Sequence, residues 1–114
     1  MPDEIETLLR RLISGDQAAA AAVLAGACTS DVPALLVAAA LISGDRDGRL
    51  LARAAGHART TRDRQLVAVA TADVAGDHDL FDALVRDHLA DHPDNVLAAW
   101  IATRHAERRV PFTR

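Results

Sequence analysis

Two histidines come closest to the spacing of a known chemical site. His88 and His92 are four positions apart, the spacing with which one helix presents two ligands to a zinc ion, and His78 is nearby in the sequence. No cysteine accompanies them, and the HExxH pattern of zinc proteases is missing. The simpler interpretation is a pair of surface or half-buried histidines near the end of a helix, where the dipole favours an imidazolium. We therefore predict no metal ion and no cofactor.

Other arrangements that could support catalysis are equally weak. The sequence has no glycine-rich phosphate loop and no nucleophile elbow. Its few serines, Ser14, Ser30 and Ser43, stand in turn segments rather than beside a base. Asp and His residues are so numerous that pairing them by eye has no specificity. The sequence thus predicts a protein that is not an enzyme.

An arginine-rich segment between residues 46 and 64 raises the question of a phosphate-bearing partner. It contains six arginines, but Asp45, Asp47 and Asp63 are interspersed with them, and no aromatic residue offers a stacking surface. The whole chain has a net charge of −3 and a pI of about 5.9, so no global positive field attracts nucleic acid. We expect a solvated, ion-paired face and no nucleic-acid partner.

Composition also bears on compartment and on membranes. Cys28 is the only cysteine, so no disulfide can form within the chain, and we expect it to be a small buried hydrophobic residue at a helix end. The start, MPDEIETLL, lacks the basic segment and apolar core of a secretory signal. The longest apolar stretches are too short and too rich in alanine to span a bilayer. These features predict a soluble, cytoplasmic protein without a membrane partner.

The elements that position these residues are marked by a repeated Gly-Asp pair. The pentapeptide LISGD occurs at 12–16 and again at 41–45, and DVAGD follows at 73–77. Glycine tolerates the left-handed conformation that ends many helices, and aspartate accepts hydrogen bonds from the free N–H groups that begin the next one. An apolar stretch with helical periodicity stands on each side of every pair. Each Gly-Asp therefore predicts the bend of a helical hairpin.

The three bends predict an all-α domain over residues 1–114. Its hairpins cover about 3–28, 31–59 and 62–92, and a final helix covers about 95–109. The bends are about 30 residues apart, a period typical of helical-repeat proteins. Each hairpin has more apolar surface than it can bury by itself, so stacking of neighbours into an α-solenoid is expected.

The third hairpin carries a family resemblance. The stretch GDHDLFDALVRDHLADHPDN, from Gly76 onward, matches the length and punctuation of a tetratricopeptide repeat. The longer stretch from ARTTRDRQLV to NVLAAWIA resembles the N-terminal repeats of the tetratricopeptide repeat protein 38 family, over about residues 31–105. Two departures stand out: both spacings between bends are shorter than the usual period of about 34 residues, and Phe81 and His88 replace small residues of the motif. The resemblance implies a helical-repeat scaffold with a protein-binding surface.

The resemblance also implies where a partner would bind. The first helices of tetratricopeptide hairpins line a concave groove, and by position six residues would form its wall: Ala34, Ala38, Leu41, Leu66, Ala70 and Asp73. Asp73 stands out because it occupies the position of Leu12 and Leu41 in the other two copies. A carboxylate there could bind an arginine or an N-terminal amine of a partner, or it could simply be exposed to solvent.

The final helix suggests a second surface. Leu97, Trp100 and Ile101 form an apolar face that either seals the end of the core or contacts a second copy of the chain, because an uncapped solenoid end favours association. We expect a non-catalytic module for binding a protein or peptide partner or for self-assembly as a homodimer. The alternative is a small helical bundle that binds a small molecule or has a weak activity.

Overall fold

The computed structural model describes residues 4–45 and 47–109 and contains, within those ranges, seven helices and no strand. Residue 3, where the first hairpin was predicted to begin, and Arg46 of the arginine-rich segment lie outside them. Consecutive helices pack against each other in pairs. Their order along the chain is α1 (Glu4–Ile13), α2 (Gln17–Gly26), α3 (Pro33–Ser43), α4 (Arg49–His57), α5 (Thr61–Ala75), α6 (His78–Asp91) and α7 (Val96–Arg109). The all-α prediction is thus confirmed.

The Gly-Asp pairs form the bends of the three hairpins. Gly15, Gly44 and Gly76 have φ angles of 92°, 87° and 73°, a region that residues with a Cβ rarely adopt. Asp16 then accepts hydrogen bonds from the first N–H groups of α2, and Asp77 from Leu80 N in α6. Asp45 acts over a longer loop, because α4 begins only at Arg49. Its two carboxylate oxygens accept from Leu50 N and Leu51 N at 3.0 and 3.1 Å.

The centre of the molecule is α3. Every residue from Leu35 to Leu41 is buried, because α3 is in contact with α1, α2, α4 and α5. A helix that is covered on all sides must be apolar on all sides, and no charged residue occurs between Asp31 and Asp45.

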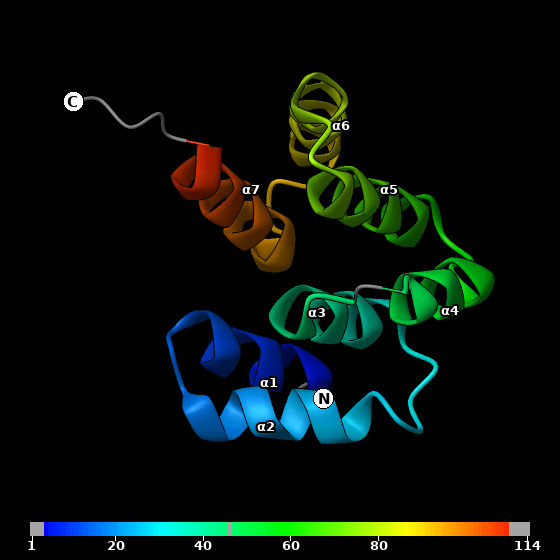
Figure 1. Cartoon of the computed structure of the whole chain (residues 1–114), viewed down its shortest axis with the longest axis vertical. Coiled ribbons are helices and arrows are strands. Elements are labelled where there is room, and N and C mark those ends of the chain that lie inside the picture. The colour runs from blue at the N-terminus through cyan, green and yellow to red at the C-terminus, as the bar shows by residue number, and fades with distance from the viewer. Residues whose placement is uncertain (1–3, 46, 110–114) are drawn as a thin grey trace.

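The last helix returns to the first. The first helices of the hairpins are neighbours in the order α1, α3, α5, and α7 follows α5, but α7 also packs against α1 (Figure 1). In an open solenoid each repeat touches only its neighbours. The contact between α1 and α7 therefore joins the first hairpin to the last helix, within overall dimensions of 44 × 30 × 29 Å. No helix in the described part of the chain is long and apolar enough to cross a membrane.

Candidate functional site

A buried cluster of polar side chains joins the last three helices. Asp73 comes from the C-terminal part of α5, Phe81 from α6, and His105 from α7. The side chains of Asp73 and His105 are only 2% and 3% exposed. His105 Nδ1 is 2.7 Å from Asp73 Oδ1, and Arg108, half-exposed on α7, donates to the same oxygen. The carboxylate is therefore paired twice within its own chain.

The cluster continues to the surface through a second histidine. His105 Nε2 is 2.8 Å from Nδ1 of His78, the exposed first residue of α6. The buried ring of Phe81 stacks on His105, with 3.8 Å between ring centroids and an angle of 15°. The arrangement is a continuous hydrogen-bonded path from a buried carboxylate to a surface imidazole. Sequence analysis singled out Asp73 but missed its partners. The sequence did contain an indication of these partners. An aspartate that takes the place of a buried leucine needs a hydrogen-bond donor nearby. His105 and Arg108 are three residues apart, so both donors lie on the same face of one helix.

The predicted groove residues lie mostly in the core, which corrects the expectation of an open groove. Ala38, Leu41, Leu66, Ala70 and Asp73 are buried, and Ala34 is half-buried. The physical reason is that several neighbouring helices cover both elements: α3 packs against α1, α2, α4 and α5, and α5 packs against α3, α4, α6 and α7. Beside these helices lies a cavity of about 250 Å³, which Ala34, Leu66 and Leu97 line together with side chains of α1.

The face predicted on the final helix is also largely covered. Leu97 and Ile101 are 2% and 1% exposed, so they seal the core and offer no surface to a second copy. Trp100 is half-buried against the core, and the Arg104 guanidinium lies over its ring at 4.6 Å from the centroid. Burial, followed by the charge of Arg108, lowers the pKa of Arg104.

His88 has a structural role that its sequence spacing did not reveal. It is fully buried, with Nδ1 2.8 Å from Gln65 Oε1 and Nε2 2.9 Å from Asn95 Nδ2. Asn95 in turn accepts from Ala98 N at the start of α7. Both ring nitrogens are thus occupied, and burial is the main cause that lowers the pKa of His88. No cluster of three or more potential ligands to a metal occurs in the described ranges.

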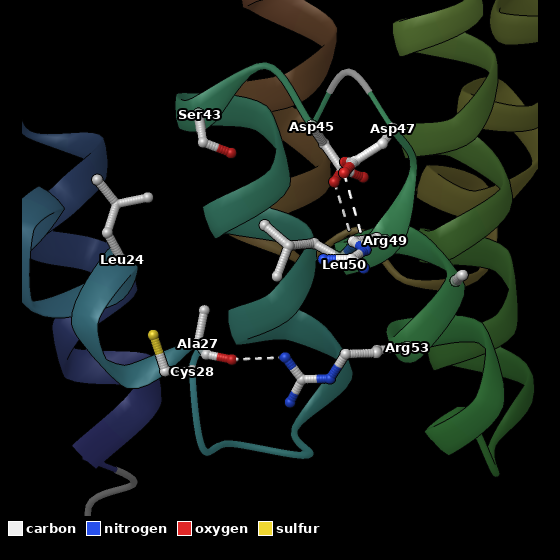
Figure 2. Close-up of a pocket in the computed structure, with 10 residues that line it drawn as sticks. Leu24, Ala27, Cys28, Ser43, Asp45, Asp47, Arg49, Leu50 and Arg53 are labelled. Atoms are coloured by element: carbon white, nitrogen blue, oxygen red, sulfur yellow. Dashed lines mark hydrogen bonds and ion pairs between the residues drawn. The ribbon is translucent and has the colours of Figure 1, made fainter.

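An open groove of about 850 Å³ lies between α2 and α4 (Figure 2). Leu24, Ala27 and Cys28 line it from α2 and the turn after it, and Leu50 and Ala52 line it from α4. Arg53 crosses one end, donating to Ala27 O and Ser30 O at 2.8 Å each. Asp45 and Asp47 stand at the other end. Cys28 is exposed here, so the prediction that it is buried was wrong.

The described arginines of the 46–64 segment are partly engaged within the chain. Arg53 binds carbonyl oxygens, and Arg62 pairs with Asp94 at 3.2 Å, a contact that holds the pKa of that carboxyl below its usual value. Arg49 lies 3.8 Å from Asp47. These contacts disperse the positive charge among carboxylates.

Comparison of the chain with protein-family models, with curated proteins and with solved structures finds no match in any of the three. The tetratricopeptide resemblance therefore stays a prediction from the sequence.

Proposed function

We propose that the chain is a helical interaction module of tetratricopeptide-like hairpins that assembles with a second copy of itself through α2 and the groove beside it. The observation that carries this proposal is a surface without charge. No charged residue occurs between Asp16 and Asp31, yet much of α2 and the turn after it is exposed, including Leu24 at 42%. A helix face exposed to water in a monomer is normally polar, and charged residues are depleted at the centre of interfaces.

The same face carries both a projection and a hollow. Leu24 is exposed at the edge of the groove, and Leu50 and Ala52 line the opposite wall. A twofold axis would place Leu24 of each copy in the groove of the other, which makes the contact self-complementary. The axis would also reverse the groove, so that exposed Asp47 at one end would meet Arg53 at the other end of the second copy.

The test is the mass of the protein in solution as a function of concentration. We expect twice the chain mass of 12.1 kDa at high concentration, and a return to the chain mass in Leu24→Glu, because a buried carboxylate would oppose association. Leu80→Glu is the matched control, since Leu80 is exposed to a similar degree, 48%, on α6. A wild-type protein that keeps the monomer mass, or two variants with the same mass, would overturn the proposal.

A further inference from the structure

The path from Asp73 to His78 fixes where protons reside on both rings. An ionised carboxylate accepts hydrogen bonds and donates none, so His105 must carry its hydrogen on Nδ1. In the neutral ring, Nε2 of His105 is then an acceptor, and His78 must donate from its own Nδ1. Among the described residues no hydrogen bond engages the remaining nitrogen, Nε2 of His78, which keeps its lone pair. A buried carboxylate therefore sets the tautomer of an exposed imidazole on another helix.

The buried part of the path is held in place and shielded from water. Phe81, itself 2% exposed, stacks on the His105 ring. The His78 ring contacts the His105 ring edge-on, with an angle of 70° between the ring planes. A hydrogen-bonded path of this kind is stronger in a region of low dielectric constant than in water. His105 can accept a proton from His78 because the negative charge of Asp73 stabilises the imidazolium that results.

We propose that Nε2 of His78 is a nucleophilic site that accepts acyl groups from neutral activated acyl compounds such as anhydrides and aryl esters. In this step Nε2 attacks the carbonyl carbon, and the bond from that carbon to the leaving group breaks with its electron pair. The Nδ1 proton of His78 moves to Nε2 of His105, where Asp73 stabilises the charge. The products are a neutral N-acyl imidazole, an imidazolium–carboxylate pair and the leaving group as an anion. His78 is the reacting residue, whereas His105 and Asp73 are positioning residues.

The charges around His78 favour a neutral donor over a phosphorylated one. Asp77 and Asp79 flank it in the sequence, and Asp82 follows on the same helix, all of them exposed. Arg108, a cation bonded within the path, binds the far end at Asp73 rather than His78. Negative charge close to the nucleophile repels a phosphoryl donor and leaves an uncharged acyl compound unaffected.

The experiment measures acylation of individual histidines by diethyl pyrocarbonate, a neutral acyl donor, followed by peptide mass spectrometry. His57 is the control within the same chain. It is also partly exposed and also has a carboxylate partner, Asp31 at 3.3 Å, but that pair is at the surface and no buried path stands behind it. At about pH 8 free histidines are neutral. We expect His78 to react at least tenfold faster than His57, which is less than the rate acceleration that a general base typically provides. Equal rates would overturn the proposal.

Two variants separate reactivity from mere structure. Asp73→Asn keeps an oxygen that can accept from His105 but removes the charge, so His78 should slow to the rate of His57 across the pH profile while His57 is unchanged. A folded variant in which His78 keeps its full rate contradicts the mechanism. If Asp73→Asn does not fold, Arg108→Gln serves instead, because Arg108 is 55% exposed. It removes the cation that competes for Asp73, so His78 should react faster, and an unchanged or slower rate is the refuting result.

Discussion

The pairing of Asp73 with His105 should be visible as coupling in protein stability. We consider Asp73→Leu, which restores the residue found at the equivalent buried positions 12 and 41. The substitution leaves His105 Nδ1 without its acceptor in a site that is 3% exposed. Removal of one partner from a buried pair destabilises by about 3–5 kcal/mol. Burial of a leucine side chain offsets about 2 kcal/mol of this. The net loss is therefore about 1–3 kcal/mol.

The double variant should behave differently from the sum of the single ones. His105→Leu alone removes the buried donor to the carboxylate and leaves it the half-exposed Arg108, so it should also destabilise by about 3 kcal/mol or more. In Asp73→Leu/His105→Leu no buried polar group is left unpaired, and well-packed apolar replacements of buried pairs are often neutral or stabilising. We expect the free energy of unfolding of the double variant to lie within about 1 kcal/mol of the wild-type value. The coupling energy between the two positions is then above about 2 kcal/mol.

Urea unfolding of the four proteins, followed by circular dichroism, measures this cycle. A domain of this size has about 5–15 kcal/mol of stability, so each step lies within range. The reasoning is refuted if the two single changes add within about 0.5 kcal/mol, because the contact would then contribute nothing of its own. It is also refuted if Asp73→Leu is as stable as the wild type.

Two further predictions concern proton linkage and the hairpin bends. Burial, followed by the charges of His92 and Arg62, lowers the pKa of His88 below its unfolded value of 6.5, so the unfolded chain binds more protons and stability should fall as the pH decreases below about 6.5. Urea midpoints between pH 7 and pH 5 should fall less in His88→Gln than in the wild type, and equal slopes would contradict the assignment. Gly44→Ala should destabilise by about 1 kcal/mol, because its φ is 87° although no atom lies within 4 Å of the added Cβ. Gly56→Ala, equally unobstructed but inside α4, should instead stabilise by about 0.5–1 kcal/mol, and thermal melts that give both changes the same sign would contradict this.

Local structure was predictable because its causes are local. The Gly-Asp pairs end one helix and begin the next within a few residues, and Gly15, Gly44 and Gly76 each follow the first helix of a hairpin. The longer loop before α4 shows the limit of this reasoning. Asp45 was predicted to cap a helix beginning directly after it, but it reaches Leu50 N and Leu51 N across an intervening turn at Gly48.

The contacts between distant elements could not be predicted in the same way. The packing of α7 on α1 depends on the rotation that accumulates from hairpin to hairpin, which no short stretch of sequence specifies. The contacts of α7 with α1, α5 and α6 bury Leu97 and Ile101. Cys28 was misplaced for a related reason, because its exposure depends on how far α2 and α4 stand apart.

Position 73 is an aspartate where the first two hairpins have a leucine. The third hairpin therefore needs a different kind of helix packed against this position. Leu12 and Leu41 are satisfied by any apolar helix that fits beside them. Against such a helix, Asp73 would be a buried charge without a partner. The free-energy cost of burying an unpaired charge is far larger than that of a poorly fitting apolar contact. Only a helix with donors at the matching height, as α7 has in His105 and Arg108, can cover it. The residue that breaks the repeat is therefore the one that selects α7 as the helix packed against this part of α5.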